Sequence, residues 1–404
     1  MSIKREHFWI IFILGALTAL GPFSIDMYLP AFPDIATNLN TNVARVAISL
    51  SSFFVGIALG QLIYGPLLDR FGRKLPLYVG LGLYILTSLA CLFVGTIDQL
   101  IFIRFLQALG SCAAAVGSMA MVRDFFPVKD SAKVFSLLIL ILGTSPLVAP
   151  TVGGYVTAQF GWHAVFIILA VLALAMALAV AFVLPEAHTP DTTISLKPGP
   201  IFKNYWRVIK IAPFILYTLT GAFAFCGLFA YVAGSPFVFM EVYHLDTKTF
   251  GWVFAFLSIG FISASQTNNF LLNRFDSAQI SQMSLLVQAI ASSLFFILMF
   301  NNAVTLPIFI IFLFIILACV GFAAPNTSAL ALAPFTKNAG SASALMGAIQ
   351  MGLGSLTSLI LGAINPTTAI PMAATMAMTS LIAITLVFAG RKKLNPQQVW
   401  PADL

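Results

Sequence analysis

Twelve long apolar stretches dominate the sequence and restrict what the chain can fold into. A bilayer core is about 30 Å thick, so a spanning helix needs roughly 20 mainly apolar residues, and each stretch has about that length or more. A backbone surrounded by lipid must satisfy its own hydrogen bonds, which leaves helix as the only structure for such segments. The sequence therefore predicts an all-α integral membrane protein with 12 transmembrane helices, at about residues 8–30, 46–68, 75–94, 98–122, 133–158, 162–184, 212–235, 248–271, 279–300, 303–332, 341–364 and 369–389.

The composition excludes a soluble globular protein. Charged residues make up 8% of the 404 residues, whereas soluble domains carry about 25%. The formal net charge is +7, but a nucleic-acid partner would need Lys and Arg clustered on one face. Here they are spread through short loops, so we expect no nucleic-acid partner. The four cysteines lie inside apolar stretches, and we expect packing roles for them rather than disulfides.

A polar interval rich in proline and charge, from Pro185 to Lys210, separates six apolar stretches from the other six. We predict an N-terminal six-helix bundle at 1–184, a cytoplasmic linker at 185–211 and a C-terminal six-helix bundle at 212–404. The two halves are related in sequence, because Leu-Leu-Asp-Arg-Phe at 67–71 corresponds to Leu-Leu-Asn-Arg-Phe at 271–275. Such a parallel repeat is a known plan of transporters, with the site at the interface of the halves.

The positions of the basic residues predict the orientation. Short cytoplasmic loops are enriched in Lys and Arg. With the N-terminus inside, only Arg45 and Lys248 of the 20 basic residues fall outside, and only Arg104 lies within a span. The reverse topology would place most of the basic residues outside, against this rule. We therefore expect a multi-pass protein with both termini in the cytoplasm.

Four stretches of the sequence resemble a known family. Gly-Pro-Leu-Leu-Asp-Arg-Phe-Gly-Arg-Lys at 65–74 is similar to the loop signature of the major facilitator superfamily. The segments Ser24–Asp34, Arg104–Gly110 and Gly143–Gly154 narrow the resemblance to the bicyclomycin-resistance (Bcr/CflA) subfamily of drug:proton antiporters. The last of them resembles the antiporter motif.

The resemblance implies a fold, an activity and a location. It implies the major facilitator fold in a bacterial inner membrane, and efflux of small amphipathic or antibiotic-like compounds by alternating access, driven by protons. Its partners would be a drug-like small molecule, protons and the lipid bilayer, and we expect a monomer without cofactor or metal.

Other function classes fit less well. The chain has no Gly-x-x-x-x-Gly-Lys-Ser/Thr loop for ATP and no His-Glu-x-x-His pair for zinc, so we do not expect an enzyme. A channel would need rings of polar groups. A proton-coupled transporter of a metabolite, such as an amino acid or siderophore, stays open as the alternative.

Asp26 is the only carboxylate placed well inside a span. A charge at the bilayer centre costs about 2.5–3.5 kcal/mol on insertion scales, so we predict a function for it. Counted from the outer ends of their helices, Asp26 and Arg104 lie at similar depth. We predict that they couple transport to protons, with Arg104 either a structural counter-ion to Asp26 or a group that tunes its proton affinity. The alternative for Asp26 is a cap or pair near the outer end of its helix.

Candidate substrate-binding residues lie in both halves. Gln107 is one turn from Arg104 on the same face and either hydrogen-bonds substrate or packs between helices. Phe225 and Tyr231 are candidates for a pocket that holds aromatic or cationic drugs. The predicted set is Asp26, Tyr28, Gln107, Phe225 and Tyr231.

Two further motifs have conformational roles if the resemblance holds. The loop signature either fixes orientation by its positive charge or forms a cytoplasmic latch, in which Asp69 meets the helix start near Gly340 and Ser341 and Arg73 reaches Asp124. The latch residues are Gly65, Asp69, Arg70, Gly72, Arg73, Lys74 and Asp124. In the antiporter motif, small residues and prolines shape the contact between the fifth and eighth spans and limit leak; these are Gly143, Pro146, Pro150, Gly153 and Gly154.

Overall fold

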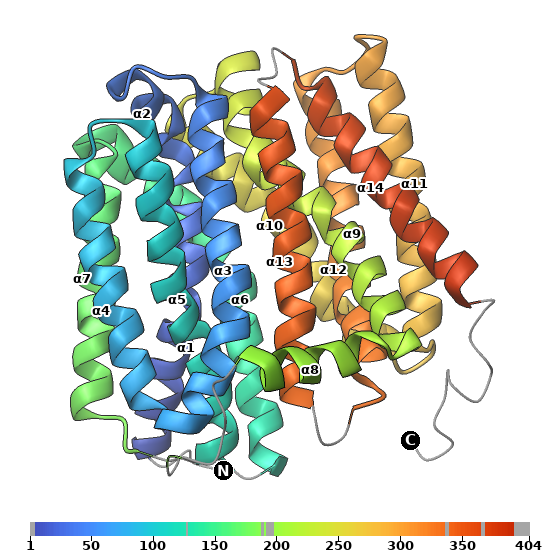
Figure 1. The fold of residues 1–404 in the computed structure, drawn as a ribbon. Coiled ribbons are helices and arrows are strands. Elements are labelled where there is room, and N and C mark those ends of the chain that lie inside the picture. The colour runs from blue at the N-terminus through green and yellow to red at the C-terminus, as the bar shows by residue number, and fades with distance from the viewer. Residues whose placement is uncertain are drawn as a thin grey trace. The chain divides into compact units, whose positions relative to one another are not determined.

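The computed structural model describes residues 5–126, 128–186, 190, 198–335, 339–364 and 368–391. This part of the chain is built of helices, with no strand (Figure 1). The α-helices are α1 (Arg5–Asp26), α2 (Phe32–Asn38), α3 (Val43–Phe71), α4 (Lys74–Ala90), α5 (Ile97–Phe125), α6 (Val128–Phe160), α7 (His163–Phe182), α8 (Pro198–Ile209), α9 (Ala212–Pro236), α10 (Thr247–Leu271), α11 (Ser277–Phe300), α12 (Leu306–Leu332), α13 (Ala339–Ile364) and α14 (Ile370–Arg391). Short helices lie at Leu29–Ala31 (η1), Cys91–Phe93 (η2) and, as a π-helix, Phe237–Val242 (η3).

The expected number of membrane-length helices is confirmed. Eleven stretches of the described residues are long and apolar enough to cross a membrane. The twelfth long helix is α6, with 33 residues that include Pro146 and Pro150. Apolar length therefore predicts these helices well, because no other backbone structure satisfies itself in lipid.

Contacts along the chain divide it into two compact units. The first comprises Met1–Lys197 and Asp246–Ala255, and the second comprises Pro198–Leu245 and Phe256–Leu404. In the first unit, α5 packs against α1, α3 and α4, and α1 also packs against α6 and α7. In the second, α9 packs against α12, α13 and α14. Each unit therefore has a helix at its centre whose side chains meet several neighbours.

The first span departs from the single helix expected over residues 8–30. Helix α1 ends at Asp26, a turn follows at Met27 and Tyr28, and the chain continues through η1 into α2. Pro30 and Pro33 are the second residues of these two short helices, where proline is tolerated because an N–H in the first turn has no helical partner. The break places a helix end beside Asp26.

The polar interval between the halves also contains a helix, which the sequence analysis did not identify. Helix α8 starts at Pro198 and packs on α9 and α13. Its inward residues Ile201, Tyr205 and Val208 recur at helical spacing. A short amphipathic helix among charged residues gives no apolar run, so a search for spans misses it.

Helices α4 and α5 approach backbone to backbone. A Cβ on Gly110 would lie 2.6 Å from the carbonyl oxygen of Gly80 and 2.7 Å from the backbone nitrogen of Tyr84. Only glycine allows this approach, since Cβ atoms do not come within 3 Å of such atoms. The contact brings the side chains of α4 close to those of α5 around Arg104.

A membrane-spanning α12 would have its two ends on opposite sides of the membrane. Ala303 precedes this helix and Ala333 follows it, and both are exposed, while the four native cysteines are buried. With the expected orientation, an Ala303→Cys variant reacts with a membrane-impermeant maleimide added to intact cells. An Ala333→Cys variant reacts only after the membrane is permeabilised. Labelling of both variants from one side would contradict the membrane crossing of α12, and the reverse pattern would contradict the orientation.

Candidate functional site

Arg104 is a fully buried cation in the middle of the first unit. Its side chain lies on α5 and has no exposed surface. Nη2 donates a hydrogen bond to the backbone oxygen of Ser24 at 2.9 Å, and Nη1 donates to Oε1 of Gln107. The Ser24 carbonyl belongs to the last turn of α1, whose carbonyls have no helical N–H partner. Arg104 therefore caps the C-terminus of α1, where the helix dipole favours a cation.

Three aromatic rings surround the guanidinium. Its central carbon lies 4.2 Å from the ring centroid of Phe53, 4.5 Å from that of Tyr28 and 5.8 Å from that of Phe166. The faces of aromatic rings attract cations, most strongly where water is excluded. The charge is thus stabilised by rings from α3, α7 and the turn after α1, and no carboxylate of the described residues pairs with it.

A network of buried hydroxyl and amide groups continues from Arg104. Nε2 of Gln107 donates to Oγ of Ser88 at 2.7 Å, so both ends of the amide are engaged. The hydroxyl of Tyr84 meets that of Ser24, and the hydroxyl of Tyr28 meets that of Ser49 at 2.8 Å. Buried polar groups need such partners. The network fixes the rotation of α1, α3, α4 and α5 about their axes.

Asp26 lies at the end of α1, and 5% of its surface is exposed. Within the described part of the chain, the ion pairs are Arg45 with Asp98, and Arg73 with Asp69 and with Asp124. No hydrogen bond or ion pair of a described residue reaches the Asp26 carboxyl. The structure thus does not show the counter-ion arrangement considered for Arg104, because the guanidinium binds the Ser24 carbonyl two residues earlier.

The antiporter motif lies on α6 and contacts two other segments, the turn after α1 and the first turns of α10. A Cβ on Gly153 would meet the backbone of Met27, so α6 touches the turn directly after Asp26. A Cβ on Gly154 would lie 2.5 Å from the oxygen of Thr247, and one on Gly251 would lie 2.9 Å from that of Pro150. The motif therefore meets the first turns of α10, which is the eighth span. Gly143 and Pro146 lie earlier on α6, and the role of the motif in limiting leak stays a prediction.

The loop signature forms a charged cluster where α3 ends and α4 begins. Nε of Arg73 donates to Oδ2 of Asp124 at 2.6 Å, and Nη1 donates to Oδ1 of Asp69 at 2.8 Å. The expected contact of Arg73 with Asp124 is thus present. Burial lowers the pKa of Arg73, but the hydrogen bonds to Asp124 and Asp69 together with the negative charges of these carboxylates raise the pKa above its ordinary value. Gly72 has φ 82°, which favours glycine and lets α3 turn into α4.

Glu186 belongs to this cluster and was missed by the sequence analysis. Its Oε1 accepts a hydrogen bond from the backbone N–H of Arg73 at 3.1 Å. Its only signal is an isolated acidic residue directly after the sixth apolar stretch. Arg70 and Lys74 flank Arg73 and Gly65 lies two turns earlier on α3. The expected contact of Asp69 near Gly340 and Ser341 stays a prediction.

The second unit holds the other two predicted substrate residues. Phe225 and Tyr231 both lie on α9, six positions apart, so they occupy different faces. The ring of Phe225 is partly exposed and lies 6.0 Å from that of Phe229 and 6.4 Å from that of Phe261. Tyr231 is 1% exposed. Phe225 is therefore the more accessible of the two in its own unit.

Buried amides in the second unit were also missed. Nδ2 of Asn326 donates to Oδ1 of Asn268 at 2.6 Å, and Nε2 of Gln288 donates to the backbone oxygen of Ala224 at 3.1 Å. Their signal is an amide residue inside an apolar stretch. They tie α10 to α12 and α11 to α9 with uncharged groups, whereas the first unit uses a charged one.

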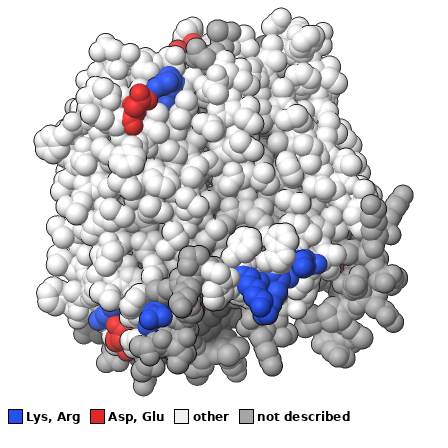
Figure 2. Space-filling view, in the orientation of Figure 1, with Lys and Arg blue, Asp and Glu red and all other residues white. Residues whose placement is uncertain are grey.

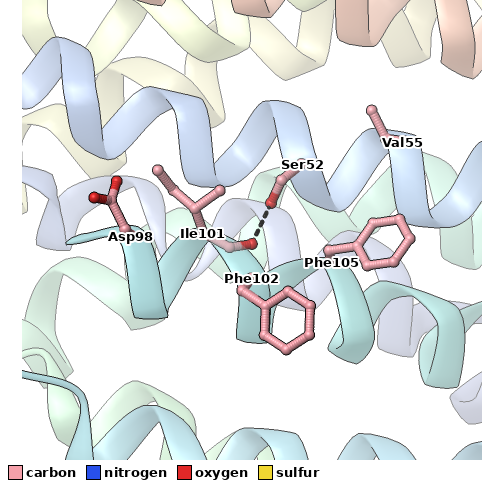
Figure 3. A pocket seen from close by; sticks show the side chains of 6 residues that line it. All are labelled: Ser52, Val55, Asp98, Ile101, Phe102 and Phe105. Atoms are coloured by element: carbon pink, nitrogen blue, oxygen red, sulfur yellow. Dashed lines mark hydrogen bonds between the residues drawn. The ribbon is translucent and has the colours of Figure 1, made fainter. Parts of the chain in front are cut away.

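A surface groove of about 330 Å³ runs between α3 and α5 (Figure 3). Its lining is mostly apolar and comprises Ser52, Val55, Asp98, Ile101, Phe102 and Phe105. Val55 and Phe102 are exposed in the interior of two membrane-length helices, where acyl chains surround the protein. The groove does not include Arg104, so it is separate from the buried network.

Comparison with known proteins identifies the family. Residues 14–359 match the sequence profile of the Major Facilitator Superfamily. The chain belongs to the major facilitator superfamily. It is a multi-pass membrane transporter and not an enzyme, as expected.

Several bacterial proteins are similar to this transporter over nearly their whole length. An MFS-type transporter of Bacillus subtilis (strain 168), YdgK, is 36% identical over 96% of both chains. A bicyclomycin resistance protein homolog of Haemophilus influenzae (strain ATCC 51907 / DSM 11121 / KW20 / Rd) is 30% identical over 95% of this chain and 96% of its own. The multidrug resistance protein MdtL of Escherichia coli O45:K1 (strain S88 / ExPEC) is 29% identical over 93% and 95%.

Solved structures of transporters share the fold. A crystal structure of a D-xylose-proton symporter has a TM-score of 0.74 at 14% identity, covering 94% of this chain and 97% of that one. A bacterial homolog of the human lysosomal transporter Spinster has a TM-score of 0.72 and covers 98% of this chain and all of its own. At this low identity the likeness concerns the fold alone, and it confirms the major facilitator fold.

The geometry predicts that Arg104 cannot be replaced by lysine. A lysine ammonium has no planar fork, so it would not reach both the Ser24 carbonyl and Gln107. We expect Arg104→Lys to lower the free energy of unfolding by about 1–3 kcal/mol, the cost of one unsatisfied buried acceptor. The matched control is Arg45→Lys, since Arg45 forms an exposed pair of the kind worth less than about 1 kcal/mol. Thermal unfolding in one detergent compares them, and equal midpoints for the two variants would contradict this role.

Proposed function

We propose that this transporter is a proton-coupled efflux pump of the bicyclomycin-resistance type. It would export small amphipathic or antibiotic-like compounds across a bacterial inner membrane, with both termini in the cytoplasm. Two relatives support this, one named for bicyclomycin resistance and one for multidrug resistance, and both align with nearly the full chain. The four motif stretches support it independently.

The observation that carries the proposal is that no described residue pairs with the carboxyl of Asp26. Asp26 is buried at the end of α1, and Arg104, the cation that caps this helix, is bound to the Ser24 carbonyl and Gln107. An ion-paired carboxylate resists protonation, because its partner stabilises the charge. A buried carboxyl without a partner is free to take up a proton and become neutral. Asp26 is therefore the proposed proton carrier.

Arg104 acts on the proposed protonation of Asp26 as a positioning residue. It caps α1 and holds the turn that follows Asp26, while Gly153 lets α6 lie against the same turn. A movement of α6 or α1 would therefore reach the surroundings of Asp26 directly. We propose that proton and substrate exclude one another here, so that a proton entering from outside releases substrate outward.

The remaining predicted residues have supporting roles. The hydroxyl of Tyr28 and the amide of Gln107 are engaged by Ser49, Ser88 and Arg104, so we propose that they shape the site from behind. Phe225 and Tyr231 contribute the aromatic surface of the second unit. The Arg73 cluster, with Asp69, is the proposed latch, which acts on the populations of states rather than on the site.

The energetics follow from charge balance. Exchange of one proton for a neutral drug moves one net charge inward, which gains about 2.3 kcal/mol per 100 mV of membrane potential. Exchange for a monovalent cation is electroneutral and depends on the pH difference alone.

This proposal predicts the behaviour of Asp26→Asn. The amide is close to the acid in shape but does not titrate, so the variant should lose proton-driven efflux of every substrate. A panel of growth-inhibition assays in an efflux-deficient host first identifies the exported compounds. Efflux from energised cells then compares the wild type with Asp26→Asn and with Asp34→Asn, an exposed carboxyl on α2 that serves as control.

Efflux by Asp26→Asn at the wild-type rate, still dependent on the proton gradient, would show that protons travel elsewhere. Absence of resistance to any compound, together with proton-driven uptake or export of an amino acid or siderophore, would favour the metabolite transporter instead.

A further inference from the structure

Helix α8 presents an aromatic stripe to its surroundings. Phe202 is 67% exposed and Trp206 is 49% exposed. Their rings stack with centroids 6.1 Å apart and an interplanar angle of 15°. Residues four apart lie on the same side of a helix. The stripe is therefore a continuous and largely exposed apolar surface on α8.

A basic stripe runs beside the aromatic one. The basic stripe comprises Lys203, Arg207 and Lys210, which are spaced four and three residues apart and are all exposed. Lys203 and Arg207 directly follow the two aromatic residues. Nζ of Lys210 lies 5.6 Å from the Trp206 ring centroid, so the two stripes touch. No acidic residue occurs at 198–210 to neutralise the three charges. Figure 2 shows the resulting cluster of blue surface over α8.

The opposite face fixes the direction in which these stripes point. Val208 is buried, and Ile201 and Tyr205 are partly buried where α8 packs on α9 and α13. Nδ2 of Asn204 donates to Oγ of Ser341 in the first turn of α13 at 2.9 Å. Figure 1 shows α8 running crosswise to α12 and α13 of its own unit. The helix cannot turn its aromatic rings inward without breaking these contacts.

We propose that α8 is a binding surface for anionic phospholipids. Tryptophan and phenylalanine beside a row of cations suit the boundary between headgroups and acyl chains, where a helix lies in the plane of the membrane. Lys203, Arg207 and Lys210 bind headgroup phosphates, and Phe202 and Trp206 enter the upper part of the acyl region. Positive charge at the surface attracts anionic lipids within a Debye length. A positive-inside role alone accounts for the cations but leaves the exposed aromatic stripe unexplained.

The test uses the purified full-length protein in nanodiscs. These expose both leaflets, so the result depends neither on the proposed orientation nor on transport. Nanodiscs of phosphatidylcholine carry a small equal fraction of either brominated phosphatidylglycerol or brominated phosphatidylcholine. The fluorescence of Trp206 is obtained by subtracting the fluorescence of the Trp206→Phe variant from that of the wild type. The subtraction removes the contribution of the other tryptophans. We expect several-fold stronger quenching of this signal by brominated phosphatidylglycerol.

A charge variant and a matched control complete the design. Lys203→Gln, Arg207→Gln and Lys210→Gln, introduced together into both backgrounds, should equalise quenching by the two lipids. Arg274→Gln, which removes an exposed cation elsewhere in the second unit, should keep the preference, and high salt should weaken it in the wild type. The proposal is overturned by equal quenching in the wild type, by no quenching of the Trp206 signal, or by a preference that survives the triple substitution.

Discussion

A guanidinium buried in a membrane-spanning helix has to be satisfied by the protein, because neither water nor lipid supplies acceptors there. Arg104 meets most of this requirement with the Ser24 carbonyl, the Gln107 amide and the rings of Tyr28, Phe53 and Phe166. Its Nε is buried without a hydrogen-bond partner among the described residues. The groups that contact the guanidinium come from α1, α3, α5, α7 and the turn after α1. The relative positions of these elements in the first unit therefore depend on one charge.

The same arrangement decides the chemistry available to Asp26. Since Arg104 binds neutral acceptors, it stabilises the end of α1 without forming an ion pair with the nearby carboxyl. An ion pair would hold a carboxylate in its charged form. Two roles that a counter-ion would combine are therefore separate in this protein: Arg104 positions the site, and Asp26 is the proposed proton carrier.

The sequence predicts the spans well because apolar length is a local property. It predicts depth as well, since counting along two helices places Asp26 and Arg104 at the same level, and the structure has Arg104 bound two residues from Asp26. The sequence does not predict the hydrogen-bond partner of Arg104, because that partner depends on where α1 ends and on how α5 is rotated. Glu186 was missed for a related reason, because its contact to Arg73 joins residues more than 100 positions apart. Helix α8 was missed because it contains no long apolar run.

We propose that Asp26 titrates as a carboxyl that has no ion pair with a described residue. Infrared spectroscopy of the purified transporter over a range of pH tests it most directly, because a protonated carboxyl and a carboxylate absorb at different frequencies. The account predicts an acid band in the wild type that is lost as pH rises, is absent from Asp26→Asn and responds to an exported compound. A wild-type Asp26 that stays a carboxylate throughout, as an ion-paired group would, or an identical band in Asp26→Asn, would contradict it.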